Sequence, residues 1–197
     1  MIVATGAGVW LGLRTNDRAI QTDDLSATVL SPAKQLSSFS LIDHHGQDFT
    51  LENLKGRWSW LFFGYTSCPD VCPNTMSLLD TVVGKIAQRH SKEHQVVFVS
   101  VDPERDTIKV LSKYVPYFNE SFVGVTGETD ELNKFADELG ILRVKIEADQ
   151  GSGYLVDHTA SILLINPLGQ LQALFSPPHD VLKLVNDFGK ITDQIKL

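Results

Sequence analysis

The chain has 197 residues, of which 43% are hydrophobic, so it can build the core of one globular domain but hardly of two. Acidic residues outnumber basic ones by 24 to 17, which gives a formal net charge of minus 7 and leaves no basic surface field to attract nucleic acid. The two cysteines, Cys68 and Cys72, cannot form a disulfide framework, and a bridge between them would close too short a loop to add much stability.

The first 13 residues, MIVATGAGVWLGL, carry no charge, and Arg14 ends the run. As a helix they would span roughly 20 Å, short of the roughly 30 Å hydrocarbon core of a bilayer. They also lack the charged start and cleavage site of a signal peptide. We expect residues 1–13 to be the end of a truncated membrane anchor, with a short apolar tail as the alternative. Residues 14–36 are polar and aperiodic, which predicts a linker, and residues 37–197 form the predicted domain.

The first half of the predicted domain alternates strands with a helix. Short alternating runs in 39–43 and 47–51, separated by HHG, predict an N-terminal hairpin. The continuous apolar run WSWLFFGYT (58–66) predicts a buried central strand that leads into the cysteine loop. Apolar residues at spacings of three and four then predict a helix from Pro73. A second buried strand is predicted at 95–102.

The second half continues the same alternation. Helical patterns cover 106–115 and 128–140, with a short strand at 121–127 between them, and the sequence after His158 predicts a hairpin followed by a last helix from about residue 179. Asp106 is a candidate either for a contact with the cysteine loop or a partner or for the N-cap of the first of these helices, and Gly140 is a candidate C-cap of the second. Strands alternating with helices predict an α/β domain with a mixed central sheet flanked by helices.

The cysteines fall where a helix begins, and the positive end of a helix favours a thiolate. Redox pairs usually have two residues between the cysteines, whereas three separate Cys68 from Cys72, which places two sulfurs suitably for one metal ion. Asp70 lies between them and disfavours a bare thiolate, a penalty that a bound cation would reverse. Three interpretations stay open at this point: a metal site, a purely redox pair, and two inert thiols.

Two thiolates are an incomplete ligand set for structural zinc, but two thiolates and one imidazole suit copper. Of the six histidines, His158 stands apart because we expect it in a loop just before the apolar strand SILLIN. Met76 follows Cys72 by one helical turn, where its spacing with Leu79 favours a place in the core over a role as a ligand. The residues alone therefore favour, without establishing, a copper site in which one histidine completes the pair of cysteines.

Three motifs in this order, GYTSCPDVCPNTM, VSVDPERDT and DHTASILLINPLG, closely resemble the SCO/SenC family of copper chaperones, from about Phe39 to the C-terminus. The resemblance implies a thioredoxin-like fold and a copper ion, Cu(I) and/or Cu(II), bound by Cys68, Cys72 and His158. It implies a role in cytochrome c oxidase assembly, in which copper is delivered to the binuclear copper site of subunit II, or the cysteines there are reduced. A copper donor or a thiol reductant would be a further partner. The domain would face the periplasm of a bacterium, anchored in the inner membrane by its N-terminus.

Three acidic residues, Asp70, Asp102 and Asp157, are candidates for contacts behind the ligands or with a partner protein. The competing hypothesis is a thiol-disulfide oxidoreductase or a redox sensor that binds copper incidentally, which leaves enzymatic activity open. A generic disulfide reductase would keep a proline where Ser161 stands. A peroxide-scavenging thiol enzyme is less favoured, because Tyr65 replaces the threonine expected three residues before the first cysteine. If copper binds, oxidation to the disulfide should abolish binding and acidification should release the metal.

Overall fold

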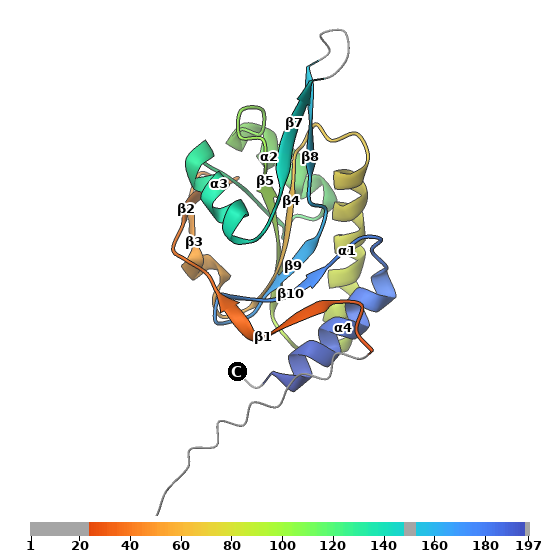
Figure 1. Cartoon of the computed structure of the whole chain (residues 1–197). Coiled ribbons are helices and arrows are strands. Elements are labelled where there is room, and N and C mark those ends of the chain that lie inside the picture. Colours follow the sequence, from red (N-terminus) through yellow and green to blue (C-terminus); the bar gives the residue numbers. More distant parts are fainter. Residues whose placement is uncertain (1–23, 148–152, 196–197) are drawn as a thin grey trace, which may run out of the picture.

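The computed structural model describes residues 24–147 and 153–195. These residues form an eight-stranded mixed sheet of order β1-β10-β9-β4-β5-β6-β2-β3 and a separate two-stranded sheet, with helices on both faces of the larger one (Figure 1). The strands are β1 (Thr28–Gln35), β2 (Ser40–Asp43), β3 (Asp48–Thr50), β4 (Trp58–Gly64), β5 (His94–Ser100), β6 (Val123–Thr126), β7 (Arg143–Glu147), β8 (Tyr154–His158), β9 (Ile162–Ile165) and β10 (Gln170–Phe175). The helices are α1 (Val71–Arg89), α2 (Ile108–Phe118), α3 (Thr129–Glu138), α4 (Val181–Gln194) and the short 3-10 helix η1 (Leu51–Leu54).

The strands at the centre of the main sheet are continuously apolar because both of their faces are covered. Every residue of β4 and β9 is buried, as are the last five residues of β5. β4 pairs in parallel with β5, and β5 with β6. On the other side of β4 come β9, β10 and β1 in that order, and each of them is antiparallel to the strand before it. The predicted α/β class with a mixed sheet is confirmed, and so is the N-terminal hairpin, which consists of β2 and β3.

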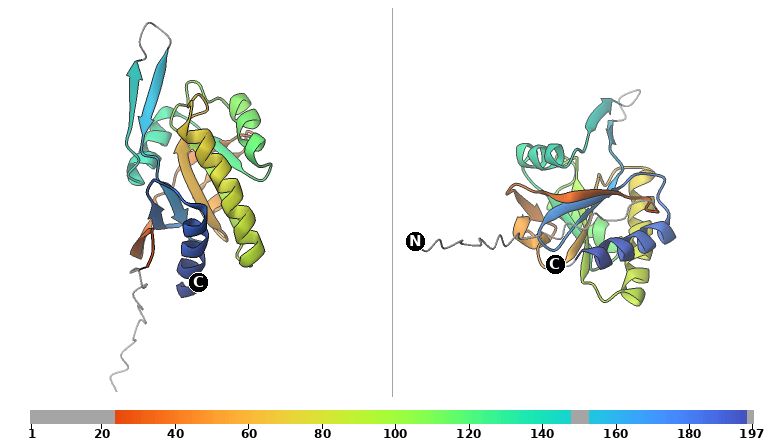
Figure 2. Two further views of the ribbon diagram at one scale, coloured as in Figure 1. Left: turned by 90° about the vertical axis from the view of Figure 1, so that its right-hand side faces the viewer. Right: turned by 60° about the horizontal axis from the view of Figure 1, so that its bottom comes forward.

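Alternate side chains of β4 point to opposite faces of the sheet and pack against different helices. The ring of Trp60 lies 5.5 Å from that of Phe188 in α4, between centroids. Phe63 points the other way, and its ring lies 5.7 Å from that of Phe135 in α3. α1 and α4 lie side by side on the first face, and α3 covers the opposite one (Figures 1 and 2). Truncating such a buried aromatic side chain to alanine costs about 3–5 kcal/mol, so these contacts hold the helices firmly on the sheet.

The antiparallel hairpin of β7 and β8 projects from one end of the domain (Figure 2). Its last residue is His158, which pairs with Arg143 at the base of the hairpin. The sequence analysis did not predict this hairpin, although residues 143–147 alternate charged and apolar side chains in the manner of a half-exposed strand. The structure therefore places His158 at the end of a strand, where the sequence analysis expected a loop.

The predicted linker over 14–36 is wrong for its second part, because β1 pairs antiparallel with β10 at the edge of the main sheet. Pro32 and a shift in register between Val29 and Lys34 break the alternation that would have indicated a strand. The domain also reaches further upstream: the buried carboxylate of Asp187 in α4 accepts hydrogen bonds from the backbone N–H and the hydroxyl of Ser26, at 2.8 and 2.6 Å. Residues 14–23 and the predicted anchor, 1–13, lie outside the described residues.

Two helix starts differ from the predictions. α1 begins at Val71 rather than at Pro73, so Cys72 lies in its first turn. α2 begins at Ile108, and its N-cap is Thr107, whose side chain accepts a hydrogen bond from the backbone N–H of Val110. The expected capping role of Asp106 is therefore wrong. Within the described residues, none of the helices has the length and apolar character needed to cross a membrane.

Candidate metal centre

The two cysteines lie where β4 ends and α1 begins, and both are free thiols. Cys68 is half-buried in the loop, whereas Cys72 is completely buried in the first turn of the helix. The backbone N–H of Cys72 donates to Sγ of Cys68, with 3.4 Å between nitrogen and sulfur. The amide in the first turn of α1 thus faces the sulfur of Cys68 and links the loop to the helix.

His158 comes to this loop from a position 86 residues further along the chain. Its Nε2 lies 3.6 Å from Sγ of Cys72. Its Nδ1 lies 3.1 Å from the carbonyl oxygen of Thr159, which can only accept, so Nδ1 donates and the lone pair of Nε2 faces the sulfur. The rings of Phe62 and Tyr65 meet the imidazole edge-on, with centroids 6.2 and 6.0 Å away. Sequence reasoning selected the histidine that the structure brings to the cysteines.

Burial keeps the Cys72–His158 pair uncharged. It raises the pKa of the Cys72 thiol far above its ordinary value, and the nearby Cys68 and Asp106 raise it further. Burial also lowers the pKa of His158, although the hydrogen bond to Thr159 and the charge of Asp157 act in the opposite direction. At neutral pH the pair is therefore a thiol and a neutral imidazole, and a cation that bound there would displace the thiol proton.

The sulfur of Cys68 contacts the backbone of Cys72, and the sulfur of Cys72 contacts the imidazole of His158. The three side chains do not surround a common point. In residues 24–147 and 153–195, no group of three or more His, Cys, Asp or Glu side chains stands at metal-binding spacing. A site with three ligands would need the half-buried side chain of Cys68 to turn toward Cys72 and His158. The donor set itself, two sulfurs and one imidazole nitrogen, fits copper and the other soft metals.

A cleft of about 480 Å³ opens beside the thiols and the imidazole, lined mainly by apolar side chains. Val71, Ile146 and Leu155 lie in its wall and are about half exposed, at 46%, 48% and 46%. Asp70 and Asp157 lie at the same cleft. Asp157 is exposed, and the carbonyl group of Thr159, rather than this carboxylate, accepts from Nδ1 of His158. Apolar side chains therefore surround the site, and two carboxylates lie at its edge.

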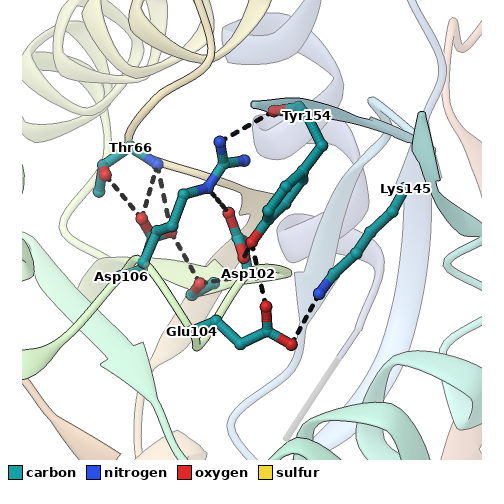
Figure 3. A network of polar contacts seen from close by, with 8 residues as sticks. Thr66, Asp102, Glu104, Asp106, Lys145 and Tyr154 are labelled. Carbon is teal, nitrogen blue, oxygen red and sulfur yellow. Dashed lines mark hydrogen bonds and ion pairs between the residues drawn. The ribbon is translucent and has the colours of Figure 1, made fainter. Parts of the chain in front are cut away.

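Of the two roles considered for Asp102, contact with a partner protein is contradicted, because its side chain is completely buried. It pairs with Nε of Arg105 and accepts a hydrogen bond of 2.7 Å from the hydroxyl of Tyr154 (Figure 3). Asp106 is also buried and accepts a 2.6 Å hydrogen bond from the hydroxyl of Thr66. Sequence reasoning missed the roles of Thr66, Arg105 and Tyr154: the first two lie inside quoted motifs, but Tyr154 carried no signal.

The remaining candidates from the sequence have structural contacts of their own. Met76 is buried in the core, as predicted. His44 is buried near β6, where its Nδ1 accepts from the backbone N–H of Gly124 at 2.9 Å. The rings of His90 and His94 pack against Phe188 in α4. These contacts give structural roles to His44, His90 and His94, which the sequence analysis did not select as ligands.

Gly64, the last residue of β4, leaves space for the sulfur of Cys72. A Cβ added at this position would lie 3.0 Å from Sγ of Cys72 and 2.8 Å from the ring of Phe98. We expect Gly64→Ala to lower the free energy of unfolding by about 1–3 kcal/mol through overpacking, as measured by urea denaturation. Gly84→Ala is the matched control: nothing lies within 4 Å of its Cβ, and alanine there should stabilise α1 by up to about 1 kcal/mol. Equal stability of the two variants would contradict this prediction.

The order of the sheet, the dithiol loop at the start of the first long helix and a histidine directed at it together define a thioredoxin-like protein with a dithiol-histidine site. The family model for SCO1/SenC matches residues 28–193. The chain belongs to the SCO1/SenC family.

Relatives of the chain include plant and bacterial proteins. It is 32% identical to the mitochondrial SCO1 homolog 1 of Arabidopsis thaliana over 92% of its own residues, and spans 56% of that protein. The crystal structure of Arabidopsis thaliana ScoI with copper bound is 34% identical, with a TM-score of 0.77, and the match covers 81% of this chain and 98% of that one. Copper-bound ScoI of Bradyrhizobium japonicum is 31% identical, with a TM-score of 0.69 and coverage of 79% and 98%.

Proposed function

We propose that this chain is a copper chaperone of cytochrome c oxidase assembly. Reduced Cys68 and Cys72 bind one copper ion together with His158, and the ion passes by ligand exchange to the binuclear copper site of oxidase subunit II. The observation that carries this proposal is the 3.6 Å contact between Sγ of Cys72 and Nε2 of His158. Copper-bound relatives of the same fold support the choice of metal.

The chemistry of the donor atoms explains how such a site would load and unload. Cu(I) takes soft ligands at low coordination number, and imidazole also serves Cu(II). Binding displaces the proton from Cys72, whose pKa burial has raised, so affinity falls as the pH falls. A disulfide between the cysteines would remove two of the three ligands. Metal binding would thus depend on both pH and redox state.

The cellular setting belongs to the same proposal. We place the domain on the periplasmic side of a bacterial inner membrane, tethered by an anchor at its N-terminus, with a copper donor or a thiol reductant as a second partner. The motifs that resemble the SCO/SenC family support this setting, as does the uncharged run over residues 1–13. Protease access to the protein in spheroplasts tests which side of the membrane it occupies, and a protected domain would reject the placement.

The decisive experiment is a copper titration of the reduced protein. His158→Ala is expected to weaken copper binding by about 100-fold, since one of three ligands is lost. It should also remove the imidazole nitrogen coupling from the electron paramagnetic resonance spectrum of the Cu(II) form. His45→Ala, at an exposed histidine, serves as the control and should bind like the wild type. Unchanged affinity and an unchanged spectrum in His158→Ala would eliminate the three-ligand site.

One observation favours a second function, reduction of the cysteines of the partner. Cys68 is half-buried and faces a helix amide, while Cys72 lies completely buried behind it. That asymmetry suits attack by the Cys68 thiolate on a disulfide, after which Cys72 releases the reduced partner and a Cys68–Cys72 disulfide remains. Each turnover consumes two electrons, which a thiol reductant must supply. Copper-free turnover on an oxidised subunit II domain, with no copper binding at all, would favour this function over delivery.

A further inference from the structure

The two halves of the candidate site come from parts of the fold that share no strand pairing. Cys68 and Cys72 follow β4 of the main sheet, whereas His158 ends β8, which pairs with β7 in a separate sheet of the described structure. Only residues 159–161 join His158 to β9, whose ladder with β4 includes the pair Ile162 and Phe62. The backbone ladders therefore bring the two segments near each other, and contacts between side chains fix how the imidazole lies against the thiols.

The turn between β5 and α2 holds the histidine hairpin through Tyr154, the first residue of β8. The buried carboxylate of Asp102 accepts from the Tyr154 hydroxyl at 2.7 Å (Figure 3). Nη1 of Arg105 donates to the backbone carbonyl oxygen of Tyr154 at 2.8 Å, and the guanidinium carbon lies 3.8 Å from the centroid of the ring. The turn thus holds Tyr154 at its hydroxyl, its ring and its backbone.

An outer ion pair joins the same two segments but adds less. Nζ of Lys145 in β7 lies 2.7 Å from the carboxylate of Glu104, and both side chains are about half exposed, at 47% and 62%. Exposed pairs of this kind are typically worth about 0.2–1 kcal/mol. The hydrogen bond to the buried Asp102 is the stronger attachment, because one partner is charged and desolvated.

The same turn also holds the thiol loop. The carboxylate of Asp106 accepts from the backbone N–H of Thr66 at 3.1 Å and from its hydroxyl at 2.6 Å, two residues before Cys68. It accepts from the hydroxyl of Ser100 at 2.7 Å, and that Oγ in turn accepts from the backbone N–H of Asp102 at 3.0 Å. Asp102 and Asp106 are therefore linked through Ser100, with the histidine hairpin on one side and the cysteine loop on the other.

We propose that the turn of residues 100–106 is a clamp that sets the distance between His158 and the two cysteines, and that Tyr154 is a positioning residue acting through His158. The inference rests on the proposed function, because it assigns the turn a role in copper binding. It also makes a claim about the metal-free protein: loss of the Tyr154 hydroxyl frees the hairpin while the thiol loop stays in place.

The first test uses the reduced, metal-free protein, so it does not depend on copper. In Tyr154→Phe, the backbone amides of β7 and β8 should exchange with deuterium about tenfold faster, because a charged hydrogen bond is lost, while β4 and α1 keep the wild-type rates. Tyr117→Phe is the matched control, since this tyrosine is 84% exposed. Unchanged exchange in the hairpin, or an equal increase throughout the domain, would overturn the clamp.

The second test is a double-mutant cycle on copper affinity. Tyr154→Phe is expected to weaken binding about tenfold, against about 100-fold for His158→Ala. If the tyrosine acts only through the histidine, the double variant is also weakened about 100-fold, whereas independent effects would multiply to about 1000-fold and reject the positioning role. Should His158→Ala bind copper like the wild type, the proposed function fails, and hydrogen exchange alone still decides whether the clamp exists.

Discussion

Replacing Cys72 by serine is expected to lower the affinity for Cu(I) by at least about 1000-fold, the largest functional effect that we anticipate from a single substitution. A thiolate is a soft ligand, whereas a serine hydroxyl is hard and keeps its proton at neutral pH. The remaining pair, Cys68 and His158, would hold the ion with only one sulfur. Competition against a chromophoric Cu(I) chelator under anaerobic conditions measures the change.

Two companion variants make this result interpretable. Cys68→Ser should lose affinity to a similar degree, although Cys68 is only half-buried, because the site needs both sulfurs. Met76→Leu, one turn further along α1, alters a buried thioether at nearly constant volume and should bind copper like the wild type. Retention of copper affinity within tenfold of the wild type in Cys72→Ser would contradict the assignment of that cysteine as a ligand.

Replacing Asp106 by alanine is expected to cause a large loss of stability, about 3–5 kcal/mol of the free energy of unfolding. The buried carboxylate accepts hydrogen bonds from the backbone N–H and hydroxyl of Thr66 and from the hydroxyl of Ser100. Alanine would leave these donors buried without an acceptor, at a cost of about 1–3 kcal/mol each before relaxation. Since small domains have only about 5–15 kcal/mol in total, much of the stability would be lost. Urea denaturation of the reduced, metal-free protein gives the value.

Asp48→Ala provides the matched control, because Asp48 is exposed in β3 and its replacement should change the free energy by less than about 0.5 kcal/mol. Asp106→Asn should fall between the two, as the amide retains one oxygen acceptor but turns a donor toward other donors. A loss below about 1 kcal/mol in Asp106→Ala would mean that the network around Thr66 contributes little to the fold.

The parts of the fold that the sequence predicts are those with strong and uninterrupted patterns. The apolar runs of β4 and β5 indicate buried central strands, and the helical spacing after the second cysteine indicates α1, whose start was misplaced by two residues. β1 was missed because Pro32 and a bulge obscure its alternation. The alternation of residues 143–147 was present in the sequence, so the β7–β8 hairpin was within reach of the same reasoning.

The candidate site was predictable in its donors but not in its supports. Cys68, Cys72 and His158 are identified by residue type, spacing and motif, and the structure brings the sulfur of Cys72 and the imidazole of His158 into contact. For Asp102 and Asp106 the sequence analysis left more than one role open, because an aspartate beside a helix start has the same sequence signature whether it caps that helix or turns inward. Only tertiary packing decides which of its neighbours it binds.

The attachment of Ser26 to Asp187 determines where any upstream segment leaves the domain. Residues 24–27 lie beside α4, at the end of the domain opposite the hairpin that carries His158 (Figure 1). The loop between β4 and α1, which carries Cys68, lies at the other end of the domain from these residues (Figure 1). A restraint acting at Ser26 would therefore pull on α4 through Asp187 and not on the segments that carry the thiols and the imidazole.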